Sequence, residues 1–67
     1  IVEITAPESF HNKTIAELKL RGQYGLNVLA IGQAQKFDIN PSPERPLQKG
    51  DMLVVIGNIA DIDRLPL

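Results

Sequence analysis

Apolar residues occur in short blocks along this chain, and turn-forming residues separate the blocks. Four blocks have the length of β-strands: residues 1–5, 27–31, 37–39 and 52–56. The run 27–31 is nearly continuously apolar, which is typical of a strand buried on both faces. Residues 37–39 alternate apolar and polar side chains, which predicts a strand with one wet face.

A helix is predicted between the first two strands. Thr14 and Glu17 have the spacing of a capping box, in which each side chain binds the other residue's backbone N–H. We expect the helix to run through Leu18 to about residue 23. Gly25 is suited to end it, because glycine adopts the left-handed conformation at low cost.

A second, shorter helix is predicted after Asn58, whose side chain is expected to cap it. Ile59, Ile62 and Leu65 recur at every third position. This spacing places them on one face of the helix, and we expect that face to contact the core.

The connections complete the fold prediction. Residues 41–46 contain three prolines, which remove three backbone donors, so this segment is predicted to be a surface loop. Gly50 supplies the positive φ of a tight turn over residues 47–51. The order is strand, helix, strand, strand, strand, helix. It predicts an α+β domain in which two helices flank a small sheet with at least one antiparallel hairpin.

Composition excludes several classes of function. The 67 residues include no cysteine and one histidine, which excludes disulfides, thiolate metal sites and multi-histidine zinc sites. The net charge of −1 argues against nucleic acid as a partner. No apolar run approaches the roughly 18 residues of a membrane span. Titratable groups are too sparse for a catalytic site, so we predict that the chain is not an enzyme.

The predicted strands contain more large apolar residues than two short helices can cover. They are Val28, Leu29, Ile31, Phe37, Ile39, Met52, Leu53, Val54, Val55 and Ile56. We therefore expect the remaining apolar face to pair with a second copy, in a two-fold homodimer. Because the first strand begins at residue 1, we also expect residues 1–67 to be one domain of a longer protein.

Two groups of polar residues are candidates for binding. Asn40 and Pro41 place an amide and a flat ring at the end of an apolar strand, which suits a nucleobase; a turn is the alternative reading. Lys36, Arg45 and Lys49 lie in or beside polar loops and have the charge to bind a phosphate, with a solvated surface as the alternative.

Three segments carry a family resemblance: residues 12–18 (NKTIAEL), 24–31 (YGLNVLAI) and 47–57 (LQKGDMLVVIG). Together they resemble the C-terminal domain of RCK (regulator of potassium conductance) proteins, the TrkA-C domain. The resemblance implies a cytoplasmic regulatory domain that senses a ligand and dimerises at the inner face of the cell membrane. Its implied partners are a nucleotide-binding RCK domain, N-terminal in the same protein, and a membrane subunit of a potassium or other cation channel or transporter.

Some family members bind cyclic di-AMP in a groove at the dimer interface, and the chain itself holds no other cofactor. The resemblance implies that the groove residues are Val28, Leu29, Ile31, Phe37, Ile39, Asn40, Pro41 and Arg45. The apolar residues would pack on adenines, Asn40 would bind a base edge, and Arg45 or Lys36 would meet the phosphates. Binders tend to offer an Arg or similar polar group just after the Ala-Ile strand end, where this chain has residues 32–34 (Gly-Gln-Ala). The alternative is a purely structural dimerisation module without a small-molecule ligand.

Overall fold

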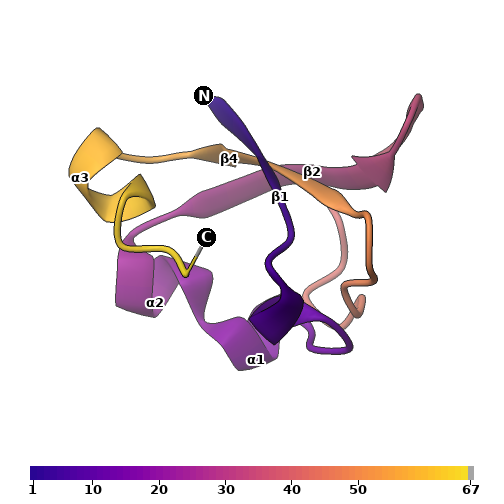
Figure 1. The fold of residues 1–67 in the computed structure, drawn as a ribbon, viewed down its shortest axis with the longest axis horizontal. Coiled ribbons are helices and arrows are strands. Elements are labelled where there is room, and N and C mark those ends of the chain that lie inside the picture. The colour runs from indigo at the N-terminus through magenta and orange to yellow at the C-terminus, as the bar shows by residue number, and fades with distance from the viewer. Residues whose placement is uncertain (67) are drawn as a thin grey trace.

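The computed structural model describes residues 1–66, which form a four-stranded antiparallel sheet in the order β1-β4-β2-β3 (Figure 1). The strands are β1 (Val2–Thr5), β2 (Asn27–Gln33), β3 (Lys36–Ile39) and β4 (Met52–Ile56). The helical segments are η1 (Glu8–Phe10), α1 (Ile15–Leu18), α2 (Leu20–Tyr24) and α3 (Ile59–Ile62). The predicted α+β class and the order of strands and helices are confirmed, and the 3-10 turn η1 is an addition.

The first predicted helix is present but is broken in two at Lys19. The capping box forms as expected: Thr14 N–H donates to Oε1 of Glu17 over 3.0 Å, and Glu17 N–H donates to Oγ1 of Thr14 over 3.1 Å. Lys19 then adopts a left-handed φ of 50°. Residues two apart lie on different sides of a continuous helix. The break therefore lets both Leu18 and Leu20 turn toward the sheet, and α2 ends at Gly25 as predicted.

Two predictions about α3 are wrong. Asn58 occupies the N-cap position, but its side chain makes no capping hydrogen bond, and Ile59 is 77% exposed. The reason is that α3 is a single turn that begins beyond the end of β4 (Figure 1), and its first residue is not part of the core cluster. Ile62 packs partly buried against the core and Leu65 is fully part of it, as predicted.

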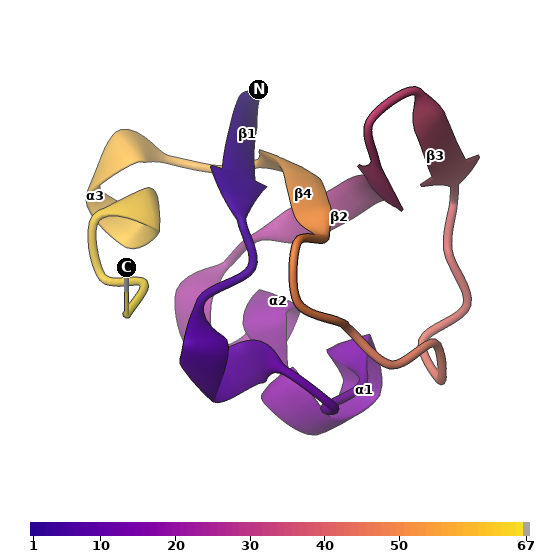
Figure 2. The same cartoon turned by 45° about the vertical axis from the view of Figure 1, so that its right-hand side comes forward.

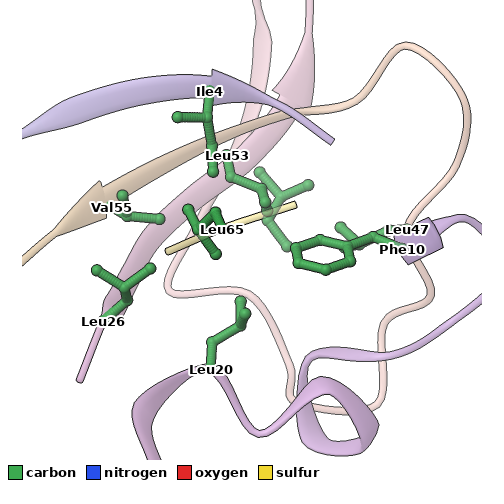
Figure 3. Close-up of a cluster of buried hydrophobic side chains, with 9 residues drawn as sticks. Ile4, Phe10, Leu20, Leu26, Leu47, Leu53, Val55 and Leu65 are labelled. Carbon is green, nitrogen blue, oxygen red and sulfur yellow. The ribbon is translucent and has the colours of Figure 1, made fainter. Parts of the chain in front are cut away.

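The core lies between the sheet and the helical segments (Figure 3). Its buried residues are Ile4, Phe10, Leu20, Leu26, Ile31, Leu47, Leu53, Val55 and Leu65. In β4 only Leu53 and Val55 belong to this cluster. Since side chains alternate along a strand, Met52, Val54 and Ile56 point to the opposite face of the sheet.

Candidate ligand-binding face

The face of the sheet turned away from the helices carries apolar residues on β3 and β4, with Glu3 and Thr5 beside them on β1, and no helix within residues 1–66 lies over it (Figure 1). Directly paired residues in an antiparallel sheet lie on the same side. Val54 pairs with Ala30, which pairs in turn with Ile39; Met52 pairs with Gly32, which pairs with Phe37. We call five residues the outer face: Phe37, Ile39, Met52, Val54 and Ile56. None of them packs against the core cluster, and Ile39 is 70% exposed.

Several predicted groove residues lie on or beside the outer face. Phe37 and Ile39 are two residues apart on β3 and therefore share its outer side. Leu29 occupies a bulge in β2 and is partly exposed. The Asn40 backbone N–H donates to the carbonyl oxygen of Leu29 over 3.0 Å, and Pro41 follows directly. The structure thus brings these five residues together around the β2–β3 hairpin.

Val28 and Ile31 lie on the other side of the sheet. Val28 pairs with Val55 and packs against the core, and Ile31 pairs with Leu53 and has no exposed surface. The prediction that Ile31 lines an open groove is therefore wrong, because its side chain is already enclosed by its own chain. Val28 likewise belongs to the core side. The bulge at Leu29 changes the alternation, so spacing along β2 alone does not separate the two faces.

Arg45 is held in ion pairs within the chain. Its Nη1 lies 3.5 Å from Oδ2 of Asp51, and its Nε lies 3.8 Å from Oδ2 of Asp38. The guanidinium predicted to meet a phosphate therefore already faces two carboxylates. The charge it presents to a ligand is correspondingly reduced.

Asp51 is the centre of this arrangement. It is 2% exposed and is the buried charged residue among those the structure describes. Gln33 Nε2 donates to its Oδ1 over 3.0 Å, and the backbone N–H of Gln48 donates to its Oδ2 over 2.9 Å. We call Gln33, Asp38, Arg45 and Asp51 the Asp51 cluster. Gln33 is thus bound to Asp51 and to the Lys49 carbonyl oxygen.

The sequence analysis did not place Met52, Val54 and Ile56 in the site. A signal was present, since both sets of alternating residues in 52–56 are apolar. That pattern indicates a strand with two apolar faces. It does not indicate that one face lies beside Phe37 and Ile39, because the contact depends on the order of the strands.

Other kinds of site are not formed by the described part of the chain. Within residues 1–66, no three His, Asp or Glu side chains gather where a metal ion could be held. None of the helices in this range has the length and apolarity needed to cross a bilayer. The candidate residues form an open surface, and no enclosed pocket lies among residues 1–66.

The sequence pattern of one family matches residues 1–65, and its description is the TrkA-C domain. The chain belongs to the TrkA-C domain family. This TrkA-C domain is 33% identical over 64 residues to the Ktr system potassium uptake protein C of Bacillus subtilis (strain 168). It is 36% identical, again over 64 residues, to the Ktr system potassium uptake protein A of the same strain. Each alignment covers 96% of this chain and 29% of the relative, so the chain spans less than a third of their length.

Solved structures share the fold of this TrkA-C domain. One is the RCK C domain of the potassium transport protein KtrA in complex with cyclic di-AMP, with a TM-score of 0.89 and 40% identity; 94% of this chain and 74% of that one are covered. Another is the RCK_C domain dimer of S. agalactiae BusR in complex with cyclic di-AMP, with a TM-score of 0.82 and 28% identity over 94% of this chain and 80% of that one. A longer BusR chain, of which 32% is covered, is solved with its busAB-promotor DNA.

These likenesses confirm the predicted family and fold. The chain is an RCK_C regulatory domain of the kind that occurs in proteins of potassium transport.

Proposed function

We propose that this TrkA-C domain senses cyclic di-AMP between two copies of itself and regulates the transport of potassium or another cation. The observation that carries the proposal is the uncovered outer face beside Asn40. The similarity to KtrA and BusR domains that were solved with cyclic di-AMP supports the same ligand.

The candidate residues match the chemistry of adenine. Phe37 and Ile39 project from one side of β3, where they can contact the flat face of a base; stacking on an aromatic ring is worth roughly 1–3 kcal/mol per base. The Asn40 amide offers one donor and one acceptor, which is the pair that the N6 and N7 edge of adenine requires. Asn40 has a left-handed φ of 55°, which asparagine tolerates better than most residues.

A two-fold dimer suits a ligand that has two equal halves. A two-fold axis presents the same residues to both adenosines, so one molecule of cyclic di-AMP would bind two chains. Binding favours the relative orientation of the copies to which the ligand binds more tightly. A coupling of about 1–3 kcal/mol is typical of such regulation. In the proposal this change passes to a nucleotide-binding RCK domain of the same protein and then to a cytoplasm-facing membrane transport subunit.

Calorimetric titration of cyclic di-AMP into the 67-residue chain tests the proposal. We expect one ligand per two chains and no binding of cyclic di-GMP at the same concentration. Asn40→Gly removes the amide while suiting the left-handed backbone, and Ile39→Ala removes apolar contact. Each variant should weaken binding by roughly ten-fold, the order expected for one good base contact.

Ile59→Ala is the matched control. Ile59 is 77% exposed and Ile39 is 70% exposed, but Ile59 lies in α3, on the opposite side of the molecule from β3 (Figure 2). It should leave the affinity unchanged. A folded dimer that releases no heat would favour the structural dimerisation module instead. If Asn40→Gly and Ile39→Ala also bind like the parent chain, the ligand site is elsewhere.

A further inference from the structure

The candidate base-binding residues depend on an edge strand that no helix supports. Phe37, Ile39 and Asn40 lie on β3 or directly after it, and β3 pairs with β2 alone. Figure 2 shows the β2–β3 hairpin at the far side of the sheet from α3. Four residue pairs with β2 therefore account for the ladder that holds β3. One further backbone hydrogen bond, from the Asn40 N–H to the Leu29 carbonyl oxygen, follows the ladder, and side chains add to these restraints.

Asp51 supplies such restraints at two points. Through Oδ1 it accepts from Gln33, the last residue of β2, which pairs with Lys36 at the start of β3. Through Oδ2 it faces Arg45, whose Nε faces Asp38 in the middle of β3. Asp38 lies on the inner side of β3, opposite to Phe37 and Ile39. One buried carboxylate thus connects to both the beginning and the middle of this strand.

Asp51 is itself anchored. Its backbone carbonyl oxygen accepts from the N–H of Ala6 over 2.8 Å, and the next residues of the chain enter β4. Leu53, two residues on, has no exposed surface. Asp51 is therefore fixed to the buried centre of the sheet and is a suitable reference point for the edge strand β3.

We propose that Asp51 is a positioning residue: acting through Arg45 and Gln33, it sets the orientation of β3 and so presents Phe37, Ile39 and Asn40 for binding. This inference rests on the proposed binding of cyclic di-AMP. It assigns Arg45 to bridging Asp38 and Asp51, in place of the phosphate contact that the family resemblance implies.

The charges within the Asp51 cluster favour bridging over phosphate contact. Arg45 contributes one positive charge, and Asp38 and Asp51 contribute two negative charges within 4 Å of it. A phosphodiester that approached the guanidinium would also approach both carboxylates, and like charges at such distances repel. The side chain of Arg45 is 31% exposed, and its Nη1 is buried beside Asp51, with the ion pair but no hydrogen bond between them.

Four variants of the 67-residue chain test the inference: Asp51→Asn, Arg45→Met, the double variant, and Arg45→Lys. The readouts are the affinity for cyclic di-AMP and the backbone amide chemical shifts of residues 36–40. We expect Asp51→Asn and Arg45→Met each to weaken binding roughly ten-fold and to shift the same amides. The double variant should be no weaker than either single one, because residues that act as one unit are not additive.

Arg45→Lys separates charge from geometry. A lysine keeps the positive charge but cannot span two carboxylates with separate nitrogens, so bridging predicts a loss of affinity. A direct phosphate contact predicts that Arg45→Lys binds well and that Asp51→Asn binds as tightly as the parent or more tightly. That pattern would overturn the inference. Arg64→Met is the matched control, because Arg64 pairs with Asp61 over 2.9 Å in the C-terminal part of the chain; it should change neither readout.

Two further outcomes remain decisive. If Asp51→Asn does not fold, Gln33→Met removes one bridge from an exposed position and keeps every charge; it should still shift the amides of residues 36–40. If the parent chain does not bind cyclic di-AMP, the proposed function fails. The positioning role is then judged on those amides alone, and unchanged shifts in Asp51→Asn would refute it.

Discussion

Gly32 and Phe37 face each other across the β2–β3 hairpin so closely that a Cβ on Gly32 would lie 2.7 Å from the Cα of Phe37. Real Cβ atoms do not approach backbone atoms this closely. The absence of a side chain at Gly32 therefore lets β3 lie close against β2.

Gly32→Ala should consequently lower the free energy of unfolding. An added methyl group has to push backbone aside, and overpacking of this kind costs about 1–3 kcal/mol. Urea denaturation measures the change. Gly22→Ala is the control: Gly22 lies in α2 with no atom within 4 Å of its added Cβ, and alanine there should stabilise the chain by about 0.5–1 kcal/mol. Equal effects of the two substitutions would show that the hairpin has room for a side chain.

Ile31 and Ile39 should respond very differently to truncation. Ile31→Ala opens a cavity in the core and should cost about 2–5 kcal/mol of stability. Ile39→Ala changes a residue that is 70% exposed, and at concentrations where the chain is monomeric it should cost less than about 0.5 kcal/mol. The two unfolding curves distinguish the faces of the sheet. Similar losses would mean that the assignment of sides is incorrect.

Ala34 occupies the turn between β2 and β3 with a φ of 54°, which places a side chain in the left-handed region. Ala34→Gly should remove this strain and raise the thermal midpoint, with a gain of about 0.5–1 kcal/mol. Ala16→Gly, an exposed position within α1, provides the comparison and should be destabilising by a similar amount. If Ala34→Gly lowers the thermal midpoint instead, Ala34 is not strained in the folded chain.

The outer face should also determine the oligomeric state. In the proposed dimer, Ile39→Glu places a charge in an apolar interface. The dissociation constant of the dimer should therefore rise by at least about ten-fold. Ile59→Glu introduces the same charge in α3 and should leave the dimer intact. Sedimentation equilibrium over micromolar concentrations measures both. If the parent chain sediments as one 7.4 kDa species, dimerisation through this face is wrong for the isolated domain.

Local features were well predicted. The Thr14 capping box forms, and Gly25 and Gly50 have left-handed φ values of 66° and 89°. Each of these depends on interactions within a few residues, so the local sequence contains the necessary information. The break at Lys19 had no such signal, because lysine rarely adopts a left-handed backbone. It follows from the need to turn Leu20 into the core, which is a tertiary requirement.

The candidate site was only partly predictable. Phe37, Ile39, Asn40 and Pro41 are consecutive or alternate residues of one segment, so their common location follows from the strand period. Arg45 was assigned to a ligand on the family resemblance, because no local pattern shows that Asp38 and Asp51 fold back onto it. Its pairing with Asp38 and Asp51 becomes visible only when the loop returns to the start of β4.

The sequence by itself determined the four strands, the two helical regions and their order, because capping, turn chemistry and hydrophobic periodicity operate over a few residues, and its motifs indicated the family. Only the tertiary structure decided which face of the sheet meets the helices, so that Ile31 is enclosed while Ile39 stays exposed. Alternation shows which residues share a face but not what that face contacts. The contacts follow from the strand order β1-β4-β2-β3, which joins residues far apart in the chain.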